Sequence, residues 1–378
     1  MIKGKAKQRT GETPTVNYRK LDALNQSMIK LFDSDPVKFF EEFKLGKRRD
    51  DDKKSTSLII GDLVDFYLLS CRGDDDEFHN RFDEKFALMK GDKGSGQVFL
   101  LADTILELTK RDTDPDSGKV KTSFETRFSE AVQRVQADGK YKGKTADKIL
   151  EDFEKNGMDY FQTLIDNIGK TVIDTSLIDK ALSVANRIKN DEFTRDYFDF
   201  DVLENTDGHN ELLTHVPIQW QYRIDDKRVV ECKSEIDMIF IDHEGKTIYP
   251  RDLKTSYDNE SFDYMYIKNS YYLQNAFYWK AVRLWALENG LGDYKVMPLD
   301  FIVGDTSANN RKPLIYQTSM EDVEKGLKGF DLRGNHYRGI EELIDEIAWC
   351  EEKDIWDCSR ESYNKMGVMK LNVKYDTV

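Results

Sequence analysis

The sequence predicts an α/β (α+β) fold in which a mixed β-sheet is flanked by helices. Three observations support this prediction. Helical patterns fill the first half of the chain, strand patterns appear from about residue 200, and helical patterns return near the C-terminus. Charged residues make up 34% and aromatic residues 12% of the 378 residues, a composition typical of a folded but very polar protein. Such a chain can bury the core of one large domain or of two ordinary ones.

The N-terminal part is expected to begin with a mobile basic segment, residues 1–17, followed by helices in residues 18–72. Ser27 fits the cap of the first helix, and Pro36 separates it from a second helix that carries three phenylalanines on one side. The next run, "STSLIIGDLVDFYLLSC", has the length and apolar density of a buried helix.

Residues 73–199 are expected to form a mainly helical insertion with Gly-, Asp- and Lys-rich loops. Residues 200–305 are expected to form the sheet, with strands at "LLTHVPIQWQYRI", "KRVVECKSEIDMIFID", "KTIYPRDLKTS" and "MPLDFIVGD". Between the last two strands, "SYYLQNAFYWKAVRLWALENG" predicts an amphipathic helix that ends at Gly290. Residues 306–378 are expected to be a helical C-terminal region.

Charge and hydropathy limit the class of protein. The net charge of −14 argues against a protein covered in phosphate contacts, so nucleic acid would have to bind in a local groove. Two basic clusters, "KLGKRRD" and "DGKYKGKTADK", are either solvated surface or part of such a groove. No apolar run reaches the ~18 residues of a membrane span, and the N-terminus lacks a signal peptide, so we expect a cytoplasmic protein with reduced cysteines.

Charged residues inside two strands are the main functional signal. In "EIDMIFIDHEGKTIYPRDLKTS", residues 235–256, symmetric pairing about Glu244 and Gly245 leaves "HEGK" as a four-residue loop. Asp237 then faces Asp252, and Glu235 faces Lys254. Because alternate residues of a strand share a face of the sheet, all four side chains are expected on one face. Pro250 cannot donate to a ladder, which predicts an edge position or a bulge.

The opposed carboxylates suggest metal chemistry. Like charges about 5 Å apart are destabilising unless a cation lies between them. Asp237 and Asp252 offer the hard oxygen ligands that suit Mg²⁺ or Mn²⁺, and Lys254 could stabilise charge on a phosphate or orient a water molecule. The alternative is a half-solvated hairpin with ordinary exposed charges. Apolar residues on both faces of the first strand favour the site.

The ordered motifs "EIDMIFID", "YPRDLKTS" and "QNAFY" resemble the PD-(D/E)XK nuclease superfamily, and within it the RecB-like and RecE-like exonucleases of phages. The resemblance implies a restriction-endonuclease-like core with a large helical insertion. It also assigns a catalytic set in which Asp237 and Asp252 are metal ligands and Lys254 is the catalytic lysine. Gln274 and Tyr278 match the helix motif, with a plain core position beside Phe277 and Trp279 as the alternative for Tyr278.

The N-terminal helices are similar to those of the same family, with one departure. Where relatives have "G-x-x-x-H", Gly61 is followed by Asp65, so Asp65 is the candidate third metal ligand and Asp62 its alternative. Glu235 replaces a common glycine and is a candidate extra acid or a partner of Lys254. Relatives that bind a 5′-phosphate use an Arg and a Ser placed like Arg19 and Ser27, although Ser27 could simply cap its helix.

The activity that the resemblance implies is metal-dependent hydrolysis of DNA by an exonuclease of phage recombination or processing, in the cytoplasm of a host bacterium. Mg²⁺ or Mn²⁺ is the expected cofactor, and the spacing of the cysteines does not predict an iron–sulfur cluster. A single-strand annealing protein is a candidate partner, an oligomer is a candidate assembly, and no membrane is involved. Two alternatives stay open: an endonuclease selective for structure or sequence, and a non-cleaving nucleic-acid-binding or assembly protein.

Overall fold

The computed structural model describes residues 21–47, 55–89, 96–114, 117–204, 209–309 and 311–369. The segment 1–17 and Arg19, for which a mobile arm and a phosphate contact are predicted, lie outside the described residues. Contacts divide the chain into two units, each described here by itself. The helical unit contains residues 55–67 and 74–183, and the sheet unit contains residues 21–47, 68–73 and 184–369.

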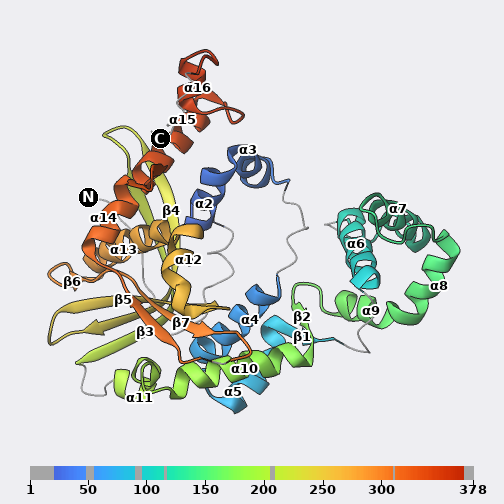
Figure 1. Cartoon of the computed structure of the whole chain (residues 1–378), viewed down its shortest axis with the longest axis horizontal. Coiled ribbons are helices and arrows are strands. Elements are labelled where there is room, and N and C mark those ends of the chain that lie inside the picture. Colours follow the sequence, from blue (N-terminus) through green and yellow to red (C-terminus); the bar gives the residue numbers. More distant parts are fainter. Residues whose placement is uncertain are drawn as a thin grey trace, which may run out of the picture. The chain divides into compact units, whose positions relative to one another are not determined.

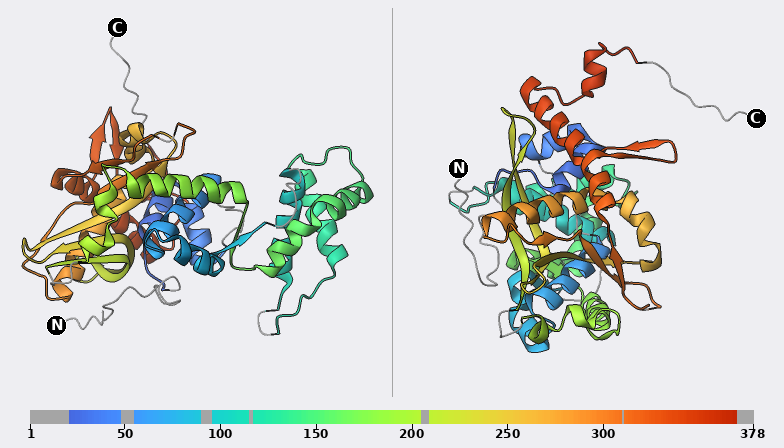
Figure 2. Two further views of the ribbon diagram at one scale, coloured as in Figure 1. Left: turned by 90° about the horizontal axis from the view of Figure 1, so that it is seen from below. Right: turned by 90° about the vertical axis from the view of Figure 1, so that its left-hand side faces the viewer.

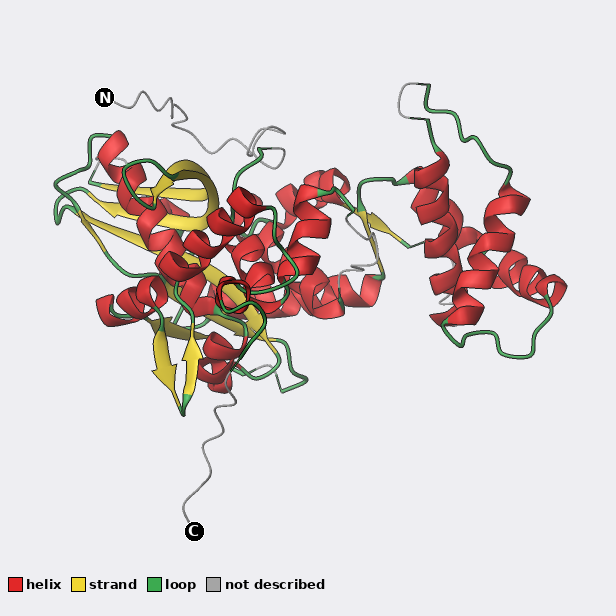
Figure 3. Cartoon of the chain, turned by 90° about the horizontal axis from the view of Figure 1, so that it is seen from above, coloured by secondary structure: helices red, strands yellow, loops and turns green. Residues whose placement is uncertain are grey.

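The helical unit agrees with the mainly helical pattern that the sequence predicts for this region (Figure 3). Four of its helices, α6 to α9, bury a common core around Ile105, Val135, Ile149 and Phe153. A short parallel pair of strands, β1 and β2, was not predicted. The elements are α4 (Thr56–Asp65), α5 (Asp75–Lys85), β1 (Phe86–Leu88), α6 (Gly96–Asp112), α7 (Phe124–Ala137), α8 (Ala146–Asn156), α9 (Met158–Asp166) and β2 (Thr171–Ile173). Two further helices begin in this unit and end in the sheet unit: the π-helix η2 (Phe66–Ser70) and α10 (Thr175–Asn190).

Tyr141 lies in the loop between α7 and α8, inside the second basic cluster. Only 2% of this residue is exposed, and the Lys144 ammonium lies 5.3 Å from the centre of its ring. A tyrosine buried in this way cannot stack on a nucleic-acid base, so the cluster presents lysines but no aromatic platform.

The first helices of the sheet unit are α2 (Gln26–Ser34) and α3 (Pro36–Phe39), followed by the π-helix η1 (Phe40–Lys44). The break at Pro36 is confirmed. The predicted cap is wrong, because Asn25 and not Ser27 caps α2: its Oδ1 accepts a hydrogen bond from the Met28 N–H at 3.0 Å. Ser27 lies exposed in the first turn, where its Oγ accepts from the Gln26 side chain.

The sheet contains six strands in the described part of the chain, in the order β3-β4-β5-β7-β8, with β6 paired to β5 (Figure 1). It is mixed because β5 runs parallel to β6 and β7 and antiparallel to β4, while β3 with β4 and β7 with β8 are antiparallel. This confirms the mixed sheet and places β5 at its centre. The strands are β3 (Asn210–Arg223), β4 (Val229–Asp242), β5 (Thr247–Ser256), β6 (Lys295–Val296), β7 (Asp300–Asp305) and β8 (Leu314–Gln317).

Helix α13 (Tyr271–Glu288) packs on the sheet and also contacts α2, α12 (Phe262–Lys268), α14 (Met320–Lys328) and α15 (Ile340–Lys353). Every residue from Tyr272 to Tyr278 is therefore buried, and the predicted amphipathic pattern is wrong for this half of the helix. Gly326 of α14 allows the close approach, since a Cβ there would lie 2.3 Å from the Tyr272 carbonyl oxygen. Past the end of α13, Gly290 has a φ of +78°, as expected for a helix terminator.

The C-terminal region departs from the helical prediction. Besides α14, α15 and α16 (Arg360–Asn364), it contains β8 and a hairpin of β9 (Phe330–Leu332) and β10 (Asn335–Tyr337). These strands have only three or four residues, too few for a periodic signal in the sequence. Shorter helices complete the unit: η3 (Arg195–Tyr197), α11 (Phe200–Leu203) and η4 (Asn259–Ser261). Among the described residues, no helix combines the length and the apolar character needed to cross a bilayer.

The β9–β10 hairpin projects from the sheet unit (Figure 2). His336 of this hairpin contacts acidic side chains within the hairpin and on α15. Its Nδ1 lies 2.9 Å from an Asp331 oxygen, and its Nε2 lies 3.2 Å from Glu342 of α15. The hydrogen bonds to Asp331 and Glu342 raise the pKa of the imidazole above its usual value. The hairpin is therefore held most firmly when His336 is protonated.

We predict that the hairpin loosens as the pH rises. Because the folded-state pKa is raised, the stabilisation is complete below the unfolded-state pKa of about 6.5 and is lost as the pH passes through the higher folded-state pKa. Hydrogen-exchange protection factors of residues 330–337, corrected for intrinsic exchange, should fall from about pH 6 to about pH 8. His336→Gln should abolish this trend, and a trend that survives the substitution would contradict the prediction.

Candidate active site

The hairpin of β4 and β5 has the predicted register. The pairs run from Asp242 with Thr247 to Met238 with Arg251, and residues 243–246 form the loop. The ladder ends there, one step before Asp237 would face Asp252. Beyond this point β5 continues to pair with β7 along its opposite edge, from Arg251 to Ser256. The predicted direct opposition of Asp237 and Asp252, and of Glu235 and Lys254, is therefore wrong.

Pro250 lies neither at an edge nor in a bulge, contrary to the prediction. It pairs with Ile239 in a regular ladder, and β5 is central in the sheet. On its other side, β5 pairs with β6 through Ile248 and with β7 from Arg251. Pro250 falls in the gap between these partners, which is where a residue without an N–H can be accommodated in a central strand.

Along β4, the residues that point to the core under α13 change from even-numbered to odd-numbered at Asp237. Ile236 faces the core with even-numbered neighbours, but beyond Asp237 the odd-numbered Ile239 and Ile241 face it. Across the ladder, the position opposite Asp237 is His215 of β3, whose φ is +50°. This left-handed residue marks the kink, and its Nε2 lies 3.1 Å from the Ser70 Oγ.

The kink leaves Asp237 with a structural contact to β5. Its Oδ2 accepts a hydrogen bond of 2.9 Å from the Leu253 N–H. The carboxylate thus binds the backbone of β5 just past the last ladder pair, directly beside Asp252. Glu235 is paired with Pro217 of β3 instead, and as the neighbour of Ile236 it alternates to the opposite face from Asp252.

Asp252 is the buried centre of the site, with 1% of the residue exposed. Its Oδ1 accepts a hydrogen bond of 2.6 Å from the Gln274 side-chain amide of α13. Its Oδ2 forms an ion pair with the ammonium of Lys254 and has no hydrogen bond to any other described residue. A carboxylate this deeply buried needs both contacts, since an unpaired buried charge is costly.

Lys254 lies on the same face of β5, and 21% of its side chain is exposed. Burial alone would lower its pKa, but the negative charges of Asp252 and Asp237 outweigh this effect and raise the pKa above its usual value. Lys254 therefore carries its positive charge at neutral pH. Its Nζ also lies 5.4 Å from the centre of the Tyr271 ring.

Lys30 of α2 is a site residue that the sequence analysis missed. Its Nζ lies 4.7 Å from the centre of the same Tyr271 ring. Burial and the charge of Lys254 lower its pKa to about 7, against the opposing effect of Asp252. The one signal in the sequence is that Lys30 interrupts the apolar run "MIKLF". The amino groups of Lys30 and Lys254 thus share one aromatic ring next to Asp252, and with a pKa of about 7 Lys30 is protonated in about half of the molecules at neutral pH.

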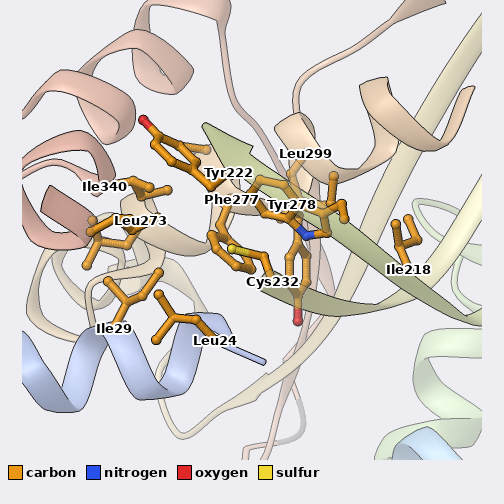
Figure 4. Packing of buried hydrophobic residues seen from close by; sticks show 14 of the residues in the cluster. Leu24, Ile29, Ile218, Tyr222, Cys232, Leu273, Phe277, Tyr278, Leu299 and Ile340 are labelled. Atoms are coloured by element: carbon orange, nitrogen blue, oxygen red, sulfur yellow. The ribbon is translucent and has the colours of Figure 1, made fainter. Parts of the chain in front are cut away.

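The two helix-motif residues have different environments. Gln274 contacts Asp252, which agrees with a role in the site. Tyr278 is one turn further along α13, is 7% exposed and belongs to the main buried cluster, where it lies among residues such as Ile218, Cys232 and Leu299 (Figure 4). Its catalytic role stays a prediction.

The remaining predicted residues lie on the helices α4 and α2. Asp62 and Asp65 lie on α4 in the helical unit, and their roles as ligands stay predictions. Ser27 has only the contact with Gln26 described above. The site of the sheet unit therefore consists of Asp237, Asp252, Lys254, Gln274, Lys30 and Tyr271.

The donor set fits a divalent cation held by few protein ligands. Across the described residues, no group of three or more His, Cys, Asp or Glu side chains converges as a complete metal cage. Mg²⁺, however, commonly binds proteins through one or two carboxylates and completes its shell with water and substrate oxygens. Asp237 and Asp252 provide such carboxylates, and both act on Lys254.

Comparison with known proteins adds no family: the sequence matches none of the protein-family models and none of the curated proteins against which it was compared.

We predict that removing the Lys254 charge destabilises the protein. Lys254→Met leaves the Asp252 carboxylate buried without its ion-pair partner, which should lower the free energy of unfolding by about 3 kcal/mol. The double variant Asp252→Asn/Lys254→Met should recover most of this loss. Urea denaturation without added metal measures both effects.

Lys246→Met is the matched control, because Lys246 also forms an ion pair, with Asp293, but both side chains are more than half exposed. Lys246→Met should lower the free energy of unfolding by no more than about 1 kcal/mol. Equal losses in the two single variants would show that the Asp252–Lys254 pair is not buried in solution.

Proposed function

We propose that this protein is a metal-dependent DNA exonuclease that hydrolyses phosphodiester bonds. The observation that carries the proposal is the pairing of Asp252 with Lys254 on a central strand, with the Asp237 carboxylate bound to the backbone of the intervening Leu253. Two carboxylates that can share a cation, beside a lysine held in its charged form, suit attack of water on a phosphodiester.

Each side chain has a role that follows from its contacts. A cation bound by Asp237 and Asp252 would supply Lewis-acid activation at the phosphate. Gln274 fixes the orientation of Asp252 through Oδ1 and leaves Oδ2 facing the site. Lys254 offers its ammonium to the charge that develops on the phosphate oxygens, and Lys30, which is partly protonated at neutral pH, adds a second amino group on the same ring.

The resemblance to phage exonucleases supports DNA recombination or processing as the setting of this activity. A single-strand annealing protein as partner, and an oligomer as the working assembly, belong to the same proposal. The strong negative net charge of the chain is compatible with it if DNA contacts are confined to the surroundings of the lysine pair.

The first test is cleavage of end-labelled linear DNA, single- and double-stranded, with Mg²⁺, Mn²⁺ or EDTA. We predict degradation from ends with either metal and none with EDTA. Asp252→Asn and Lys254→Ala should each reduce the rate at least about 100-fold, whereas Lys246→Met should leave it unchanged. Covalently closed circles should resist cleavage.

If circular DNA were cut as fast as linear DNA, the protein would be an endonuclease that uses the same residues, and not an exonuclease. Full activity of folded Asp252→Asn would overturn the site altogether.

A second prediction concerns Lys30. Lys30→Met removes the partly protonated amino group of Lys30 from the proposed phosphate site and should slow cleavage by about tenfold or more. Lys30→Arg keeps the charge and should retain more of the rate. Single-turnover cleavage and DNA binding in Ca²⁺ separate a loss of chemistry from a loss of affinity.

Lys38→Ala is the control, because Lys38 lies on the next helix, α3, with nearly half of its side chain exposed and Glu42 as its ion partner. An equal effect of Lys38→Ala and Lys30→Met would mean that general charge, rather than the position of Lys30, explains the change.

A further inference from the structure

The sheet unit contains a half-open cavity of about 370 Å³ that the proposed nuclease site does not use. Its wall comes from α12, α13, β7, β8, α14 and the β9–β10 hairpin, with lining residues spread from Phe262 to Leu332. The volume lies in the range typical of ligand pockets. The cavity is therefore built by the fold and does not lie within a single loop.

Aromatic rings dominate the cavity. Phe262, Tyr272 and Phe301 are at most 2% exposed and form its buried part. Tyr266, Tyr316 and Phe330 are partly buried and contribute further to the wall. Ring faces carry partial negative charge, so such a wall favours an aromatic guest through ring contacts and a cation through cation–π attraction.

The charged lining residues are mainly acidic. Asp263 and Asp331 are exposed and Asp322 is partly buried, against the single ammonium of Lys325 among the described lining residues. That ammonium already forms an ion pair with Glu321 at 2.8 Å. Asp331 in turn pairs with His336 at 2.9 Å, so the acidic excess of the lining comes from Asp263 and Asp322. This excess makes the entrance negative, which opposes the approach of a phosphate backbone and favours a positive charge.

We propose that this cavity is a docking site for a partner protein, which inserts an aromatic side chain flanked in its sequence by an arginine or lysine. The aromatic ring fills the apolar interior, and the basic neighbour meets Asp263 at the entrance, beside the pair formed by Asp331 and His336. Aromatic residues and arginine are also the side chains that most often anchor protein interfaces. This proposal does not rest on the proposed nuclease chemistry, so either proposal can fail without the other.

Three probes test the proposal by calorimetric titration of the full chain at low salt: acetyl-Trp-Arg-amide, acetyl-Trp-Glu-amide and the thymidine dinucleotide pTpT. The arginine peptide should bind at least about fivefold more tightly than the glutamate peptide, and the dinucleotide should not bind here. A higher salt concentration should reduce the difference in affinity between the two peptides, because salt screens the charges.

Variants locate the binding. Asp263→Asn removes one exposed charge at the entrance. It should lower the affinity for the arginine peptide by about two- to fivefold and should not lower the affinity for the glutamate peptide. Leu332→Ala, at a lining residue that is 38% exposed, should weaken both peptides. Asp226→Asn is the matched control, since Asp226 is an exposed aspartate in the β3–β4 turn and does not line the cavity.

The proposal is overturned if the two peptides bind equally, if pTpT binds more tightly than either, or if neither peptide binds. It is also overturned if Asp263→Asn and Asp226→Asn have the same effect.

Discussion

The sheet unit depends on how a buried carboxylate is neutralised at the centre of its sheet. Asp252 lies on the central strand β5 and is almost fully enclosed, so its charge must be balanced where it stands. Gln274 reaches it from α13 and Lys254 from the next position on its own face of β5. These contacts join the sheet to the helix that packs on it, and they place a charged lysine at the surface of the site.

Much of this arrangement could be predicted from local spacing. The four-residue loop fixed the register of β4 and β5, and the two-residue step from Asp252 to Lys254 determined their common face. Gln274 could be assigned only through the resemblance to a nuclease family, yet its contact with Asp252 agrees with that assignment. The register and the common face could be predicted because they depend on residues that are close together in the sequence.

The parts that could not be predicted arise from distant segments. The β4–β5 ladder ends at Met238 and Arg251, whereas β5 continues to pair along its other edge with β7, almost fifty residues later in the chain. The parity change at Asp237 depends on a left-handed His215 in β3, and nothing in the sequence around His215 marks that conformation. Lys30 reaches the site only because α2 packs against α13. Such contacts are set by tertiary packing, which a periodic pattern does not encode.

The Tyr271 ring links the two sites mechanically. It stacks on Phe262 with the ring centres 5.5 Å apart and contacts Phe301 at 5.8 Å, and both of these phenylalanines also line the aromatic cavity. The ammonium groups of Lys30 and Lys254 rest against Tyr271 itself. A guest that displaced Phe262 or Phe301 would thus move the support on which both cations lie. In a closely packed interior, the spacing of the positive charges at one site is therefore tied to the shape of the other.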